Sequence, residues 1–427
     1  MYYLLFAAYL VLFAWLVTKI KFFARSGFSS SQLVIIFLLK VMAGIFYGWI
    51  GIYYGQMAQM IDTWAYHVQS LQEYHLLTTH PIDFFTNLFH NSYEGGYTNF
   101  LSSRNSWWND VKANFFIKIM AIFDLFSFGN YYVNVIFYSF ISLFGPMAIY
   151  RIMKDVFPRQ KVSLLIAVFL VPSFIYWTSG LHKEGLIFLG LSLIMYHFYF
   201  GFKEKRFTVS RVLMILVGFV LMLILRNFLL LPLVSPLLAW IICYKMKLKP
   251  VFVFTTVFTV FLVLFFTVKY IIPGMDLPQS VVNKRQDFIE LQGHTSVNVN
   301  DLKPTFTSFL QTAPEAFSLS ILRPYPSDVR HLLSLAAAIE TSAILVFFLV
   351  FLFWRKRGMH FSPLILFCLF FSVGVLFMIG YSVNNLGAIV RYRSIVFPLL
   401  LAPMAAKIDW RRINSAFFQN MKNGNNV

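Results

Sequence analysis

The sequence is poor in charged residues. Only 12% of its 427 residues are charged, whereas 59% are hydrophobic and 19% aromatic, and the mean hydropathy is +0.70. A soluble fold cannot bury so large an apolar fraction. Apolar runs of about twenty residues, long enough to cross a hydrocarbon core of roughly 30 Å as helices, recur along the chain. The sequence therefore predicts an all-α integral membrane protein, because a membrane β-barrel would instead have short alternating segments.

Cysteine and acidic residues are also scarce. The two cysteines, Cys243 and Cys368, lie inside apolar runs, so the sequence predicts no disulfide framework and no cysteine nucleophile. The chain has 17 acidic residues against 35 lysines and arginines, which leaves a net charge of +18. These basic residues stand in short clusters between apolar runs. Such a distribution indicates membrane topology and excludes nucleic acid as the expected partner.

Eleven apolar runs predict about eleven transmembrane helices in a single polytopic membrane domain over residues 1–427. Their approximate bounds are 2–20, 33–54, 131–150, 164–177, 185–202, 212–225, 228–244, 251–271, 333–354, 363–381 and 394–406. Under this count the short basic connections fall on one side, which the positive-inside rule assigns to the cytoplasm together with the polar tail 413–427. We therefore expect a multi-pass protein of a bacterial-type inner (plasma) membrane, with a cytoplasmic C-terminus.

Two long connections, residues 55–130 and 272–332, fall on the opposite, non-cytoplasmic side. Apolar residues repeat every 3.6 residues over 113–126, which predicts an amphipathic helix lying in the membrane interface. A similar helix is expected over 305–310. Together these helices are expected to border a groove for a lipid tail and a sugar.

Charged residues beside the outer helix ends are the first candidates for a functional site, because a bilayer disfavours charge within or near its core. Directly after the second apolar run, Asp62 and Tyr66 share a helix face at spacing i, i+4, and His67 follows them. The turn between the fourth and fifth runs adds three polar residues in a row: His182, Lys183 and Glu184.

Several lone cations lie on the outer face, which the positive-inside rule leaves poor in cations. They are Lys183, Arg226, Arg323, Arg391 and Arg393. Arginine binds phosphate oxygens through a planar fork of N–H donors. These cations therefore predict a binding site for a phosphorylated ligand at the membrane surface, and a lipid-linked monophosphate or diphosphate fits best.

An enzyme that uses such a ligand also needs a base to take the proton of the attacking hydroxyl. Asp62 is the first candidate for this base. Glu184 and His67 are reserves, and His182 suits either the base or the phosphate-binding role. The outer histidines lack the spacing of metal ligands, so we expect no cofactor, and a divalent metal is not indicated.

Each candidate also has a purely structural interpretation. Asp62 then caps or solvates a loop helix, Lys183 and Glu184 form an ion pair at the membrane rim, and the outer arginines snorkel to lipid headgroups. Lys40, inside the second apolar run, is either a buried functional charge or a side chain that is paired or snorkels. The residues alone leave these alternatives open.

The chain resembles the GT-C-type glycosyltransferases and the related polysaccharide polymerases of bacterial envelopes. The likeness lies in the overall layout and in three short motifs: Asp62 and Tyr66 at the start of the first long loop, the turn Ser179-Gly180-Leu181-His182-Lys183-Glu184, and Arg391-Tyr392-Arg393 before the last helix. The resemblance implies a transferase that takes a sugar from a polyprenyl-phosphate-linked donor on the outer (periplasmic) face. It gives Asp62 the role of base and the outer cations the role of phosphate ligands, with a glycan or lipid as acceptor.

Two other classes of protein compete with this interpretation. A transporter or flippase of envelope glycolipids would also need cations and a cavity, but it is expected to carry charges near the membrane midplane and to have repeat symmetry. A non-catalytic scaffold subunit would need neither Asp62 nor the cations. Because the charges gather at one rim and both long loops fall on that side, the sequence favours the enzyme.

Overall fold

The structure is a computed structural model that describes residues 2–54, 62–89, 107–291, 293–356, 358 and 361–413. Of the tail predicted over 413–427, only Ile413 belongs to these residues. Helices make up 83% of the described residues, which contain no strand beyond two isolated bridges, Ser296 with Asn385 and Arg355 with Ile408. The predicted all-α class is confirmed.

Eight helical stretches in the described part of the chain are long and apolar enough to cross a membrane. They are α1 (Tyr2–Lys19), α3 (Ser30–Tyr53), α8 (Tyr131–Val156), α11 (Lys183–Lys203), Val209–Met246, α14 (Pro250–Ile271), α17 (Leu332–Trp354) and α18 (Pro363–Ser382). Two bent pairs raise the number to ten if each pair is one span: α9 (Lys161–Phe169) with α10 (Pro172–Ser179), bent by 53°, and α19 (Leu386–Ser394) with α20 (Phe397–Lys407), bent by 59°. The chain is thus a multi-pass membrane protein, and the count of eleven stays a prediction.

The stretch Val209–Met246 consists of two helices, α12 (Val209–Arg226) and α13 (Leu230–Met246), joined by a 3₁₀ turn. At the joint, Arg226 contacts Glu184 at the start of α11, whereas the ring of Tyr244 in α13 lies 4.5 Å from the ring of Phe202 at the end of α11. The chain therefore turns back at Arg226, so that this arginine and the start of α11 lie at the same end of the bundle.

The remaining elements are shorter or belong to the long connections. They are α2 (Lys21–Ala24), α5 (Asp62–Thr79), α6 (Pro81–Thr86), α7 (Trp107–Ser127), α15 (Leu277–Glu290), α16 (Phe306–Phe317), a π turn (Ser318–Leu322) and 3₁₀ turns at Asn87–Phe89, Asn227–Leu229 and Pro326–Asp328.

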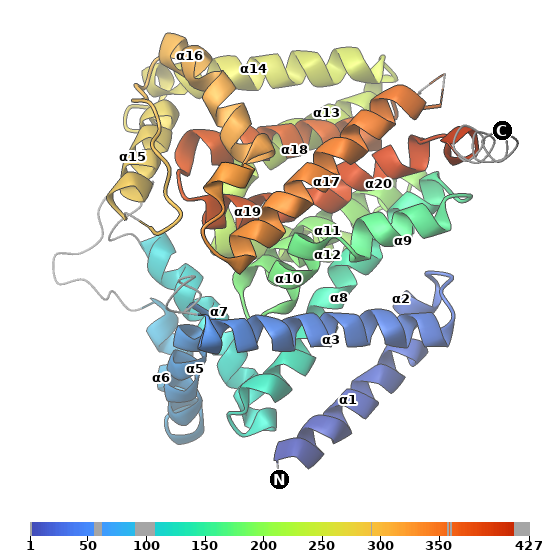
Figure 1. Cartoon of the computed structure of the whole chain (residues 1–427), viewed down its shortest axis with the longest axis vertical. Coiled ribbons are helices and arrows are strands. Elements are labelled where there is room, and N and C mark those ends of the chain that lie inside the picture. The colour runs from blue at the N-terminus through green and yellow to red at the C-terminus, as the bar shows by residue number, and fades with distance from the viewer. Residues whose placement is uncertain are drawn as a thin grey trace, which may run out of the picture.

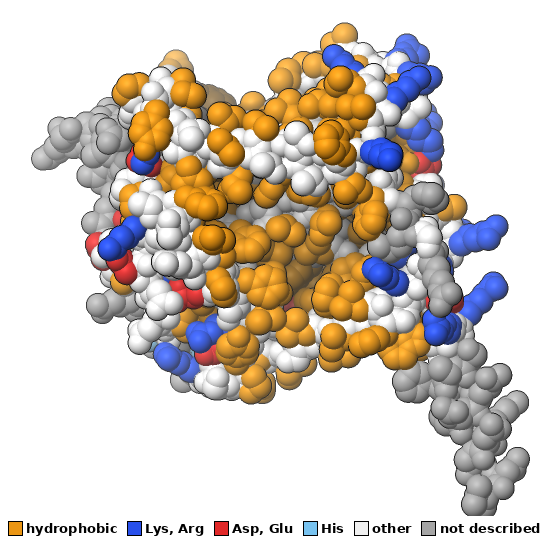
Figure 2. All heavy atoms as spheres, turned by 90° about the horizontal axis from the view of Figure 1, so that it is seen from above, with side chains coloured by type: hydrophobic (Ala, Val, Ile, Leu, Met, Phe, Trp, Pro, Cys, Tyr) orange, Lys and Arg blue, Asp and Glu red, His pale blue; other side chains and the backbone are white. Residues whose placement is uncertain are grey.

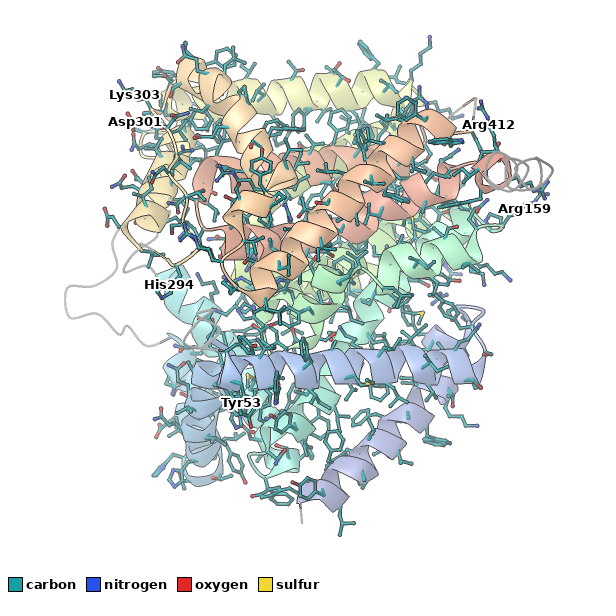
Figure 3. The ribbon with its side chains drawn as sticks, viewed as in Figure 1. Tyr53, Arg159, His294, Asp301, Lys303 and Arg412 are labelled. Carbon is teal, nitrogen blue, oxygen red and sulfur yellow. The ribbon has the colours of Figure 1, made fainter. Side chains whose placement is uncertain are left out.

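The two ends of the bundle differ in charge. Lysines and arginines gather along the right edge of the molecule, next to a broad apolar band (Figure 2). Arg159 and Arg412 lie at this basic end, and Tyr53, His294 and Asp301 lie toward the opposite end (Figure 3). Helices α5, α6 and α15, from the two long connections, also lie toward that opposite end (Figure 1). The basic clusters and these loop helices are therefore separated by the apolar band.

The helices predicted on the two long connections exist but differ in extent and setting. In α7, Phe116, Met120 and Asp124 are buried, because this helix packs between α5 and the bundle. One face of this helix is therefore packed against the protein, and its predicted place in the membrane interface stays a prediction. Helix α16 replaces the shorter one expected over 305–310 and packs on α18, where the Phe309 and Tyr381 rings are 4.9 Å apart.

The short helix α10 has a buried charged side chain at each of its ends. Glu340, from α17, accepts a hydrogen bond of 2.9 Å from the backbone N–H of Ser173 in its first turn. Lys40, from α3, donates to the carbonyl of Thr178 at 2.8 Å and lies 3.2 Å from the hydroxyl of Ser179. A carboxylate at the N-terminus and an ammonium at the C-terminus complement the helix dipole. An interrupted helix at membrane depth also needs such partners for its freed backbone groups. Lys40 is therefore a paired anchor for α10.

Replacing Lys40 with Met is expected to lower the free energy of unfolding by about 1–3 kcal/mol, because a buried carbonyl and two hydroxyls lose their shared donor. Thermal or denaturant unfolding in detergent measures the change. Lys21→Met, at an exposed lysine of the basic end, is the control and should differ little from the wild type. Equal stability of the Lys40 variant would show that α10 does not depend on this anchor.

Candidate functional site

The first turn of α5 is attached to two other parts of the bundle. The hydroxyl of Thr63 donates to the carbonyl of Leu181 at 3.0 Å, and the indole N–H of Trp64 donates to the carbonyl of Gly48 at 2.9 Å. These bonds join the start of α5 to α3 and to the turn between α10 and α11. As a result, Asp62, the first residue of α5, lies beside that turn.

The turn itself is closely packed. A Cβ atom on Gly180 would lie 2.2 Å from the ring of Tyr47, so only glycine fits where this ring covers the backbone. The hydroxyl of Tyr138 donates to the carbonyl of His182. With the turn held in this way, His182 Nε2 lies 3.7 Å from Asp62 Oδ2 at the start of α5.

Two carboxylates, a histidine and two arginines form one connected cluster. Arg391 Nη1 lies 3.2 Å from Asp62 Oδ2 and 3.4 Å from His182 Nε2. The other ring nitrogen of His182 contacts Glu184, which also pairs with Arg226 at 2.7 Å and lies 3.6 Å from Arg391 Nε. We call Asp62, His182, Glu184, Arg226 and Arg391 the charged cluster. Its members come from α5, the α10–α11 turn, α11, α12 and α19, so it forms only when the bundle is assembled.

Asp62 is the accessible acid of the charged cluster, and Glu184 is the enclosed one. The Asp62 side chain is 52% exposed, whereas that of Glu184 is fully buried. The pKa of Asp62 is lowered from 3.8 to about 2, chiefly by its hydrogen bond to His182 and further by the positive charge of Arg391, although partial burial acts in the opposite direction. Asp62 is therefore ionised at neutral pH.

Aromatic rings orient the guanidinium groups of the cluster. The Arg391 guanidinium lies 5.0 Å from the Tyr392 ring and 5.7 Å from the Trp177 ring, and the Arg226 guanidinium lies 4.1 Å from the same Tyr392 ring. Such contacts attract the cation and limit the rotamers of a long side chain. Both arginines are thereby held in place for binding.

Two lysines extend the positive charge beyond the two arginines. Lys183 Nζ lies 4.7 Å from the ring of Tyr66, which is itself 5.9 Å from the His182 ring. In α7, the pKa of Lys112 is lowered to about 8, first by burial and then by the nearby positive charges of Lys284, Arg226 and Arg391. Sequence reasoning did not select Lys112, although it lies on the same long connection as Asp62.

Three of the ten predicted site residues lie outside this group. Arg323 faces Asp328, with 3.8 Å between Nη1 and Oδ1. Arg393 is only 1% exposed and donates to the carbonyls of Ser320 and Arg323. His67 packs between the rings of Trp64 and Tyr131, and burial lowers its pKa.

The ligand-binding role predicted for Arg393 is therefore corrected to a structural one, whereas the role predicted for Arg323, which lies outside the charged cluster, stays a prediction. The reason for Arg393 is geometric. Side chains two positions apart on a helix point to nearly opposite sides, so Arg391 and Arg393 cannot both face one ligand. The seven other predicted residues, which the structure brings together, are Asp62, Tyr66, His182, Lys183, Glu184, Arg226 and Arg391.

A cavity of about 670 Å³ opens beside the charged cluster. Asp62 and Arg391 line its polar part, together with His294 and His331. The rest is largely apolar and lies between α3, α10 and α17. No group of three or more His, Cys, Asp or Glu side chains in the described ranges is arranged to hold a metal ion.

Fold and site together define a multi-pass, all-helical membrane protein with a charged, cavity-lining site at the end away from its basic clusters. A comparison with protein-family models, with curated proteins and with solved structures finds no match to this chain. Its function is therefore argued from the site itself.

Proposed function

We propose that this protein is a membrane glycosyltransferase that uses a polyprenyl-phosphate-linked sugar donor at the outer (periplasmic) face, in the synthesis of cell-envelope polysaccharide or glycolipid. The observation that carries the proposal is the pairing of Asp62 with Arg391 at 3.2 Å on the wall of a cavity of about 670 Å³. A carboxylate and a guanidinium side by side match the two needs of the reaction, a base and an anion ligand. The resemblance to GT-C-type enzymes agrees with it.

The shape of the cavity suits a lipid-linked donor. Its apolar wall includes Ala43 and Phe46 from α3 and Leu333, Ala336 and Ala337 from α17. Both helices have exposed apolar faces, and α10 lies between them (Figure 1). A prenyl chain can thus reach the cavity from the side, between α3 and α17, while its phosphate stays at the polar part.

The reaction follows from these positions. Asp62 accepts the proton of the acceptor hydroxyl, the hydroxyl oxygen bonds to the anomeric carbon of the sugar, and the bond from that carbon to the phosphate oxygen breaks. The leaving phosphate keeps the electron pair and is stabilised by Arg391. Asp62 by itself is a weak base, because His182 and Arg391 hold its pKa at about 2. A donor phosphate competes for Arg391 and so makes Asp62 more basic.

Reconstitution in liposomes tests the proposal. Purified protein mixed with a prenyl-linked sugar and a glycan or lipid acceptor is expected to release the prenyl phosphate and form a new glycosidic product. Transfer of the intact lipid-linked sugar across the bilayer, without product, would contradict the enzyme and favour a flippase. If no product forms and no lipid-linked sugar crosses the bilayer, the result would contradict both the enzyme and the flippase and favour a scaffold.

Filling the apolar wall gives a variant for the same assay. Ala337→Trp is expected to raise the KM for the lipid donor about tenfold or more, because the indole occupies the path of the prenyl chain. Ala343→Trp is the matched control on the exposed face of α17 and should leave the KM within about twofold. Equal KM values for both variants would show that the donor does not enter between α3 and α17.

A further inference from the structure

Four polar side chains from three distant segments line one part of the cavity, and we call them the polar wall. They are His294 and Thr295 from the second long connection, His331 at the N-cap of α17 and Asn385 at the N-cap of α19. Hydrogen bonds join the three segments. Arg330, next to His331, donates to the carbonyl of His294 at 2.7 Å, and the hydroxyl of Thr295 donates to Asn385 Oδ1 at 2.9 Å. The polar wall is therefore one continuous surface.

The amide of Asn385 has a fixed orientation in this wall. Its Oδ1 accepts from the hydroxyl of Thr295 at 2.9 Å and from the backbone N–H of Ala388 at 3.1 Å. The other end of the amide, Nδ2, lies against Gly293, where a Cβ atom would come within 2.2 Å of it. A donor nitrogen held in this way beside a cavity suits an oxygen atom of a ligand.

His331 adds a second donor to the wall. Its Nδ1 accepts from the backbone N–H of Ser334 at 3.3 Å, so the proton of the neutral ring is on Nε2. Burial lowers the pKa of His331 and favours this neutral form. Nε2 is buried and has no hydrogen-bond partner among the residues that the structure describes. A buried N–H without an acceptor is costly, and a ligand oxygen would remove that cost.

The polar wall lies a short distance along α19 from the charged cluster. Asn385, Ala388 and Arg391 follow one another at intervals of three residues, and all three line the cavity. Six residues span about 9 Å along a helix axis. Because Ala388 is small, the cavity continues between Asn385 and Arg391, which leaves room for a sugar ring beside Asp62.

The polar wall differs from the prenyl path in chemistry and in access. None of its four side chains is a lysine, an arginine or a carboxylate, so the wall suits hydroxyl groups better than a phosphate. His294 and Gly387, which both line the cavity, are exposed, and His294 lies toward the end of the molecule away from the basic clusters (Figure 3). A hydrophilic ligand can therefore reach the wall from the water, whereas the prenyl chain enters between α3 and α17.

We propose that the polar wall is the acceptor subsite of the enzyme, and that the acceptor is a glycan and not a lipid. The inference rests on the proposed function. Asn385 and His331 donate hydrogen bonds to oxygens of the acceptor sugar, and another hydroxyl of that sugar faces Asp62, which takes its proton. A lipid tail in this part of the cavity would leave both donors unpaired, and a site built to bind hydroxyl groups rejects a ligand that lacks them.

Kinetics with separate titrations of donor and acceptor test the assignment. Asn385→Asp keeps an oxygen for the cap of α19 but has no N–H donor, and His294→Ala removes an exposed side chain of the wall. Made separately, so that one failure to fold leaves the other, each is expected to raise the KM for a glycan acceptor about three- to tenfold, the effect of one lost hydrogen bond. The KM for the donor should stay within about twofold.

Asn298→Asp is the matched control for the Asn385 variant. Asn298 is an exposed asparagine of the second long connection and is not among the described residues that line the cavity, so its variant should leave both KM values within about twofold. If the KM for the donor rises in the wall variants and that for the acceptor does not, the assignment of the wall to the acceptor is overturned.

Direct binding separates the subsite from the enzymatic proposal. Saturation-transfer NMR of the full-length protein in detergent, with the methyl glycosides of glucose, galactose, N-acetylglucosamine and rhamnose as probes, is expected to detect at least one that binds. Its affinity should fall about threefold or more in Asn385→Asp. If none of them binds, or if the variant binds as well as the wild type, the glycan subsite is overturned even if sugar is transferred to a lipid. Binding that depends on Asn385, in a protein that transfers no sugar, would support the subsite and contradict the glycosyltransferase.

Discussion

Replacing Asp62 with Asn is expected to lower the rate constant of sugar transfer by about 10²- to 10⁴-fold, the usual contribution of a general base. The amide keeps the size of the side chain but accepts no proton at neutral pH. It can still receive one hydrogen bond from Arg391, which now lies 3.2 Å from the carboxylate. Initial rates with a lipid-linked donor in detergent or liposomes measure the loss, which should fall on kcat and less on the KM for the donor.

Asp83→Asn is the matched control for this prediction. Asp83 is an exposed acid on the same long connection, in α6, and its variant should retain wild-type activity within about twofold. If the Asp62 variant is folded and fully active, Asp62 is not the base of the reaction. Because the pKa of Asp62 is about 2, its carboxylate stays ionised between pH 7 and 5, so its protonation should not lower kcat/KM over that range.

Replacing Arg391 with Met is expected to lower kcat/KM for the donor by about 10²-fold or more. The variant loses the cation next to Asp62 and removes a partner of the buried Glu184. Removing a preorganised donor to a developing anion costs about 10²- to 10³-fold in comparable sites. Arg391→Lys should recover only part of this loss, because an ammonium has no planar fork and stacks less well on Trp177 and Tyr392.

Arg323→Met is the control for Arg391. The residue-level pattern had grouped both arginines as phosphate ligands, but Arg323 faces Asp328 and lies over the ring of Tyr325. Its loss should leave kcat/KM within about twofold. Thermal unfolding checks that both variants are folded. If both then lose kcat/KM equally, the result would contradict the assignment of Arg391, as distinct from Arg323, as the phosphate ligand.

The broad fold follows from local composition. A segment that crosses the lipid must satisfy its backbone hydrogen bonds internally, and a helix does so. Apolar runs of membrane length therefore predict the all-α class without any knowledge of the tertiary structure. The boundaries of the helices were harder to predict from the sequence. The run 212–244 contains a break at Arg226 that was found because a lone charge interrupts it. The 53° bend between α9 and α10 falls where Pro172 begins α10.

Part of the site could also be predicted from the sequence. Asp62 and Tyr66 share a helix face because of the helical period, and the rarity of cations on the side predicted to face outward singled out Arg226 and Arg391. The pattern could not decide between Arg391 and Arg393, because both flank Tyr392 and both fall on the side predicted to face outward. Only the position of α19 against α10 and the π turn decides which of them faces the cavity.

By itself, the sequence determined that this chain crosses a membrane many times as helices and that several of its cations lie at helix ends, because hydrophobicity and helical period are properties of neighbouring residues. Only the tertiary structure decided that Asp62, Glu184, Arg226 and Arg391 meet, and that Lys40 serves as an anchor of α10. The physical reason is distance along the chain: Asp62 and Arg391 are separated by 329 residues, and no local preference acts over such a separation.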